Sequence, residues 1–190
     1  MGIDFYTLTT PPANDPVLFA GADEWCRDID VADTTLVNAL ISSATVLVES
    51  MTNRVYVQRT FTGSFQCVQD SDFEEYSYIE LRRSPLISVT SVKENDVLVS
   101  SDDYIVKNTS SFSRILFPSS LSLDNDFAYP IKVVFVAGYT TVPDDIITAI
   151  KQIVLFWYEN RGDVSPDKKQ MFPFVAKAIL SKYRIINSFG

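Results

Sequence analysis

The spacing of apolar residues changes twice along this chain, and each change indicates a different kind of secondary structure. Apolar residues recur at helical spacing between residues 33 and 52, alternate with polar ones over much of 55–137, and return to helical spacing at 144–161. A period of 3.6 residues is typical of amphipathic helices, and a period of 2 is typical of strands with one buried face. The sequence therefore predicts helices on both sides of a strand-rich insertion.

The helix predicted at 144–161 has the clearest start and end. Pro143 precedes two acids, which suits a first turn, where a backbone N–H is spare and the helix dipole favours negative charge. Arg161 and Gly162 suit the end, because a cation there lies near unpaired carbonyls and glycine enters the left-handed region freely. Its large apolar stripe predicts a helix that packs against other elements.

Three further helices are predicted near residues 22–28, 33–52 and 174–184. Asp30 or Asp33 can cap the start of the second of these by accepting backbone N–H groups. Asn53 is placed to adopt the left-handed conformation at its end. We therefore expect an α+β fold that is mainly helical: an antiparallel-type helical bundle with a β-rich insertion near residues 55–137.

The two ends of the chain are expected to be extended. Residues 1–21 contain Pro11, Pro12 and Pro16 without a steady period, which indicates an arm that lies on a neighbour or is free. Residues 22–190 are expected to form a single domain, since 190 residues with 46% hydrophobic content suffice for one well-buried core. Residues 185–190 form a short apolar tail, too small for a core of its own.

The composition of the chain excludes several classes of function. The chain has no histidine, which excludes His-based nucleophile systems, imidazole bases and His-ligated zinc. Cys26 and Cys67 form neither a metal spacing nor a disulfide framework, so we expect reduced thiols in an intracellular protein. The net charge of -8 argues against a clamp that neutralises phosphates. No secretory signal and no apolar run near the ~20 residues of a membrane span is evident, so we expect a soluble protein without a membrane partner.

Two short motifs have the outline of metal sites. D-I-D-V-A-D at 28–33 has the oxygen density of a calcium loop but lacks its Gly and Glu positions, and helix-capping acids are the simpler interpretation. Pro143-Asp144 followed by D-x-K at 167–169 has the outline of a metal-dependent nuclease. A helix start and a proline-containing loop are not expected to converge on one Mg²⁺. We therefore expect no catalytic residue, metal or cofactor, with a small metal-dependent nuclease as the alternative.

The order of four segments resembles the head–tail connector, or head-completion adaptor, proteins of tailed double-stranded DNA phages and related gene-transfer particles. They are D-I-D-V-A-D-T-T-L-V-N-A-L-I-S-S-A-T-V-L-V-E-S-M-T-N-R, I-E-L-R-R-S-P-L-I-S-V-T-S-V, V-F-V-A-G-Y-T-T-V-P-D-D-I-I-T-A-I and F-W-Y-E-N-R-G. One departure is T-N-R, where the family commonly has T-G-R, and Asn tolerates the same left-handed geometry.

This resemblance implies a structural, non-enzymatic virion protein of the neck at the capsid vertex, assembled in the host cytoplasm. Identical subunits, typically twelve, would form a ring beneath the portal protein, extend the channel for double-stranded DNA and offer a platform to the next neck or tail protein. Another ring-forming module of the neck or tail is the nearest alternative.

The resemblance also implies roles for particular residues. The C-terminal segment commonly engages the portal in this family, which points to Tyr183, Ile185, Ile186 and Phe189; a tail folded back on its own subunit is the alternative. The helix at 144–161 would contribute core or subunit-contact anchors, namely Trp157, Tyr158 and Arg161. Acids facing the channel would repel phosphates and keep DNA mobile; the candidates are Asp70, Asp72, Glu74 and Glu75.

Overall fold

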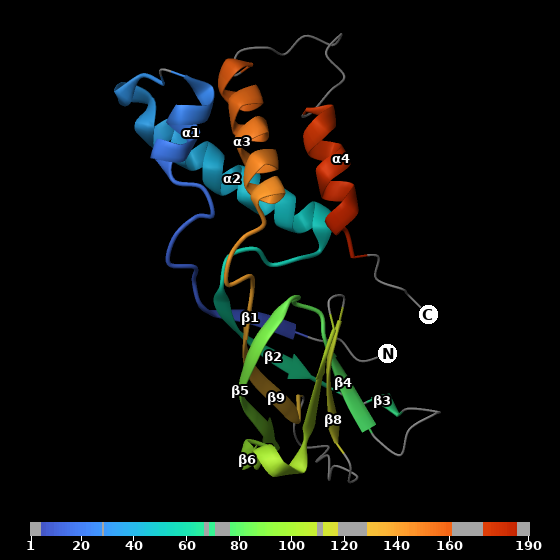
Figure 1. The fold of residues 1–190 in the computed structure, drawn as a ribbon. Helices are drawn as coiled ribbons and strands as arrows, with labels where there is room; N and C mark the ends of the chain where they lie inside the picture. Colours follow the sequence, from blue (N-terminus) through green and yellow to red (C-terminus); the bar gives the residue numbers. More distant parts are fainter. Residues whose placement is uncertain are drawn as a thin grey trace. The chain divides into compact units, whose positions relative to one another are not determined.

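The chain forms two compact units in the computed structural model, which describes residues 5–27, 29–66, 69–70, 77–109, 112–117, 129–160 and 173–185. Unit 1 combines residues 1–13 with 58–139, and unit 2 combines residues 14–57 with 140–190. Figure 1 shows that unit 1 contains the strands and unit 2 contains the α-helices. The N-terminal segment that the sequence predicts as an arm therefore supplies a strand to unit 1.

Unit 1 is built from two antiparallel sheets. The first has the order β1 (Phe5–Thr10), β2 (Arg59–Phe65), β9 (Ile131–Ala137), β5 (Leu86–Glu94) and β6 (Val97–Val99). The second has the order β3 (Gln69–Asp70), β4 (Ser77–Leu81), β8 (Ser113–Phe117) and β7 (Ile105–Asn108), and a short 3-10 turn, η2 (Ser101–Asp103), precedes β7.

Strand β9 is the centre of the first sheet, because it pairs with β2 on one side and with β5 on the other. Its residues alternate between buried and half-buried, as the period of 2 in the sequence predicts. The core of unit 1 is aromatic: Phe135 stacks on Phe61, with ring centroids 5.8 Å apart, and Tyr6 meets Phe135 edge-on. Gly63 lies opposite Tyr6, and a Cβ at Gly63 would come within 2.9 Å of the Phe65 ring, so only glycine fits there.

Unit 2 contains α1 (Phe19–Cys26), η1 (Val31–Asp33), α2 (Thr34–Thr52), α3 (Asp144–Glu159) and α4 (Phe174–Tyr183). Helix α3 packs on all three other α-helices, and α2 does the same. The apolar stripes predicted from the sequence form the core between them. Its fully buried members include Val37, Ile41, Ala44 and Val48 of α2, and Ile146, Ala149, Ile150, Ile153 and Val154 of α3.

One helical stretch among the described residues, Val31–Thr52, has the length and mean hydropathy, 1.5, of a membrane-spanning segment. This differs from the expectation that no apolar run approaches that length. The apolar face of α2 packs inside unit 2, where Ile41 and Val48 are buried in the helical core. Core helices of globular domains meet the same criteria of length and composition.

The prediction of a mainly helical bundle was wrong. The described residues are 41% helical and 33% strand, and they form two antiparallel sheets and four α-helices. The helices lie within three residues of the predicted bounds, and Asn53 closes α2 in the left-handed conformation with φ 55°. The error arose because long helical stripes stand out in a sequence, whereas the nine short strands among the described residues do not.

Candidate assembly surfaces

The last described residues of the chain are held against the end of α2. The backbone N–H of Ile185 donates to the Thr52 carbonyl at 2.9 Å, and the Asn53 side-chain amide donates to the Ile185 carbonyl at 3.0 Å. The Nε of Arg54 donates to the Tyr183 carbonyl at 2.7 Å. Asn53 has the left-handed conformation, and its side chain holds Ile185, the last described residue, on the end of α2.

A second contact fixes α4 on the start of α3. The Tyr183 hydroxyl donates to Asp145 Oδ1 at 2.6 Å, and Lys182 Nζ lies 3.5 Å from Asp145 Oδ2. Burial raises the pKa of Asp145, but the hydrogen bonds and charge of Tyr183 and Lys182 outweigh it and leave the pKa below the ordinary value of 3.8. The ionised carboxylate is therefore the form that ties α4 to α3.

We expect Asp145→Asn to lower the free energy of unfolding by about 1 kcal/mol at pH 7, because one charge-assisted hydrogen bond is weakened. A carboxyl group with a depressed pKa stabilises the fold above its unfolded pKa, and this contribution disappears as the pH falls through the folded pKa. The difference from wild type should therefore shrink below about pH 4. Urea unfolding between pH 7 and 3 measures it, with the exposed neighbour Asp144→Asn as control. A difference that stays constant down to pH 3 would contradict the assignment.

The candidate anchors of α3 have different surroundings. Trp157 and Tyr158 are both half-buried, and the Tyr158 hydroxyl donates to Asp33 Oδ2 at 2.6 Å. This bond ties the end of α3 to the start of α2. Arg161 lies outside the described residues. Sequence spacing placed Tyr158 on the apolar face of this helix and left core and subunit contact open. It did not indicate the partner of the hydroxyl, which is 125 residues away in the chain.

Several other candidate residues lie outside the described part of the chain, so their mutual positions are not given. Ile186, Phe189, Asp72, Glu74 and Glu75 lie outside it, as does the D-x-K segment at 167–169, and of Asp70 only the backbone is described. Asp144, the other half of the nuclease outline, lies in the first turn of α3. Among the described residues no group of three or more His, Cys, Asp or Glu side chains could hold a metal ion.

The described residues of the D-I-D-V-A-D motif serve the fold. The side chain of Asp30 accepts the backbone N–H of Ala32 at 2.9 Å and so caps η1, the short turn before α2. Asp33, the N-cap residue of α2, makes no side-chain cap bond, so the predicted cap lies on η1 and not on α2 itself. Cys26 is half-buried, and burial together with Glu159 and Asp23 raises the pKa of its thiol. A protonated thiol is a weak nucleophile.

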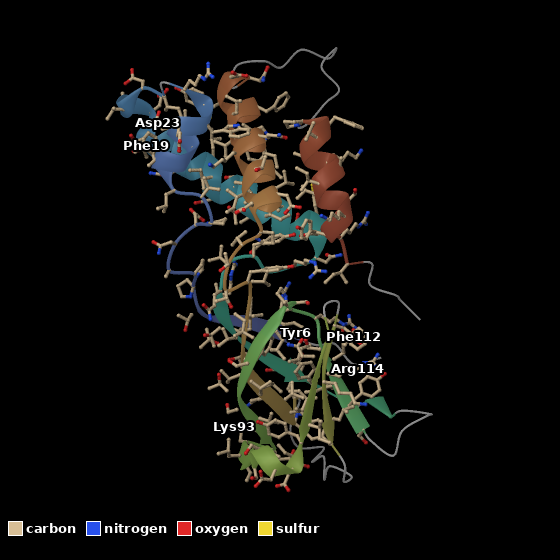
Figure 2. The ribbon with its side chains drawn as sticks, viewed as in Figure 1. Tyr6, Phe19, Asp23, Lys93, Phe112 and Arg114 are labelled. Atoms are coloured by element: carbon tan, nitrogen blue, oxygen red, sulfur yellow. The ribbon has the colours of Figure 1, made fainter. Side chains whose placement is uncertain are left out.

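Two arginines of unit 1 lie against aromatic rings. The Arg114 guanidinium lies 4.5 Å from the centroid of Tyr78 and 4.7 Å from that of Phe112 (Figure 2), and it pairs with Glu80 at 3.4 Å. The Arg83 guanidinium lies 5.3 Å from the centroid of the Tyr6 ring. A guanidinium is attracted to the face of an aromatic ring, so these contacts hold both arginine side chains on the sheets.

Besides Leu36 and Val46 of α2, unit 2 exposes apolar side chains around α1 and on α4. On α1 and the residues around it, Leu18 is 65% exposed, Trp25 42% and Val31 80%. On α4, Phe174 is 74% exposed and Val175 54%. Figure 1 shows α3 lying between α1 and α4, so these residues belong to opposite sides of the unit. We call residues 18–33 the α1 flank and residues 174–184 the α4 flank. The sequence did not predict either flank, since periodicity alone does not show which apolar side chains a fold leaves exposed.

Comparison with known proteins relates the whole chain to one kind of particle. No protein-family model matches the sequence, and the search of curated proteins finds no match. Solved structures with the same fold come from gene transfer agent (GTA) particles. The neck of an empty GTA particle, computed with C6 symmetry, matches with a TM-score of 0.79 and 16% identity over 98% of each chain.

Two further structures agree with this match. The virion of a native GTA particle matches with a TM-score of 0.73 and 16% identity over 98% of each chain. The neck of a native GTA particle, computed with C12 symmetry, matches with a TM-score of 0.64 and 16% identity over 96% of this chain and 98% of that one. At this identity the likeness shows the fold, and at that level the resemblance to head–tail connector proteins is confirmed.

Proposed function

We propose that this chain is a structural subunit of the neck of a tailed-phage-like particle. The observation that carries the proposal is the likeness of fold, over 98% of both chains, to the neck of a GTA particle. The neck structures were computed with C6 and C12 symmetry, which supports a ring of identical copies. Such a subunit acts by binding neighbouring proteins and holding them at a fixed distance, so the proposal requires no catalytic residue.

The ring docks beneath the portal protein at the capsid vertex, extends the DNA channel and presents its other face to the next neck or tail protein. The net charge of -8 supports a channel role, because an acidic lining repels phosphates and does not retain passing DNA. The acids proposed for this lining are Asp70, Asp72, Glu74 and Glu75. Assembly of the ring would take place in the host cytoplasm, before the particle is complete.

The portal contact is proposed for the C-terminal tail. Tyr183 and Ile185 are hydrogen-bonded within unit 2, to α3 and to the end of α2 respectively. These bonds support a tail that starts from a fixed point, with Ile186 and Phe189 as the apolar residues available beyond it. A short apolar segment of this kind binds a partner by strand addition or by filling a pocket.

The proposal is tested with the portal protein encoded in the same genome. We expect the wild-type protein to form rings on portal rings in negative-stain images. A chain ending at Ile185 should fold normally but bind the portal at least about a hundredfold more weakly, because the apolar anchors are missing.

The matched control neutralises the four acids with Asp70→Asn, Asp72→Asn, Glu74→Gln and Glu75→Gln. This variant should bind the portal as wild type does, but particles that contain it should release DNA more slowly. A wild-type protein that remains monomeric and never binds a portal ring would contradict the proposed function. Unchanged portal binding by the shortened chain would contradict the role of the tail alone.

A further inference from the structure

The two flanks of unit 2 carry opposite charge. Between residues 18 and 33 the sequence has five acids and one arginine, and between residues 174 and 184 it has three basic residues and no acid. Of the described acids, Glu24 and Asp30 are exposed, and Figure 2 shows Asp23 on α1. On the other side, Lys177 and Arg184 are exposed, and Lys182 pairs with Asp145. One flank is thus acidic and the other basic.

Each flank combines its charge with exposed apolar side chains. On α4, Phe174, Lys177 and Ser181 follow one another at i, i+3 and i+7, so they lie on one face, and all three are exposed. On the α1 flank, Leu18 and Trp25 are seven residues apart and are exposed together. Apolar anchors surrounded by charges are the usual composition of a surface that binds another protein.

The positions of the flanks suit a contact between unlike sides of identical subunits. Both α1 and α4 pack on α3 and on α2, and α3 lies between them (Figure 1). A ring of identical subunits needs two different, complementary surfaces on each copy, because a head-to-tail contact closes only if the second surface is free for the next subunit. Two opposite sides with opposite charge meet this requirement.

We propose that the α4 flank of one copy docks on the α1 flank of the next copy and that this contact builds the ring. The inference rests on the proposed function and extends it by naming the surfaces between subunits. Phe174 and Val175 of one copy meet Leu18, Trp25 and Val31 of the next. Lys177 and Arg184 face the acids of α1 and η1, which sets the direction of docking.

Charge reversal tests the contact. Lys177→Glu with Arg184→Glu gives a chain with two acidic flanks. The combination of Ala20→Lys, Glu24→Lys, Asp30→Asn and Ala32→Lys leaves three acids against four basic residues on the α1 flank, which gives a chain with two basic flanks. All six positions are exposed. We expect each variant alone to associate at least about tenfold more weakly than wild type, because like charges oppose one another. An equimolar mixture should recover wild-type association, since both kinds of contact in an alternating ring are then complementary.

Sedimentation velocity and negative-stain imaging, with and without portal rings, measure the outcome at low and high salt. A control with the same change in net charge on unit 1, Arg82→Glu with Lys93→Glu, should assemble as wild type does. An equal loss in this control would assign the effect to overall charge and overturn the proposal.

Two further outcomes separate the inference from the proposed function. Wild-type rings that neither variant disturbs, or two defective variants whose mixture does not recover, would overturn the interface and leave the neck function in place. Variants that form rings normally but no longer bind the portal would assign the flanks to the portal instead. A wild-type protein that forms no ring in any condition would contradict the neck function itself.

Discussion

Replacing Phe135 with alanine is expected to lower the free energy of unfolding of unit 1 by about 3–5 kcal/mol, the usual range for a buried phenylalanine. The side chain is fully buried on β9, the strand that pairs on both sides. Its ring stacks on Phe61 at 5.8 Å and receives the edge of Tyr6 at 6.3 Å. Alanine removes these contacts and leaves a cavity in the centre of a sheet, where the neighbouring strands cannot collapse into it.

Urea unfolding followed by circular dichroism and tyrosine absorbance measures this effect in unit 1. The chain has two tryptophans, Trp25 and Trp157, and both belong to unit 2, so their fluorescence follows the other unit. The control is Phe5→Ala on β1, where the ring is 57% exposed and the cost should stay below about 1 kcal/mol. A loss of less than 1 kcal/mol for Phe135→Ala would show that β9 is not the centre of the core.

The second large effect is expected in the helical unit. Ile150 is fully buried in the middle of α3, the helix that packs on α1, α2 and α4. Ile150→Ala removes three side-chain carbons at the place where these helices meet, and we expect it to cost about 2–5 kcal/mol. Helix propensity offsets little of this, because alanine exceeds isoleucine by only about 0.4 kcal/mol.

Tryptophan fluorescence during urea unfolding measures the change in unit 2. The matched control is Val46→Ala on α2, a β-branched apolar residue that is 65% exposed and should change stability by less than about 0.5 kcal/mol. Equal costs for the two substitutions would mean that α3 is not the central helix. An unfolding midpoint unchanged by Ile150→Ala would lead to the same conclusion.

The helices were predictable because their information is local. The apolar stripe of α2 spans a few turns of chain, and the Pro-Asp-Asp start of α3 lies within one turn. The left-handed Asn53 follows directly from its position after the stripe. The sheets were harder to predict because pairing is not local. The segment F-Y-T-L-T-T next to the N-terminal prolines forms β1 only because β2, more than 50 residues away, offers its edge.

The same limit applies to the candidate surfaces. The sequence points to Tyr183 as a member of an apolar face, but its acceptor Asp145 lies 38 residues earlier in the chain. The charges of the two flanks could have been counted from the sequence alone. That α1 and α4 lie on opposite sides of α3 requires the tertiary structure. Exposure of Phe174 and Val31 is likewise a property of the fold, since both residues look like ordinary core members in the sequence.

The bonds between residues 183–185 and the end of α2 have a mechanical consequence. Tension on the C-terminal tail reaches Ile185 first, and Ile185 is bonded to Thr52 and Asn53 of another helix. The load is therefore shared with α2, the longest of the described helices, before it can unwind α4 from its end. A pull on the residues after 185 would thus be resisted by the helix that organises the core of unit 2.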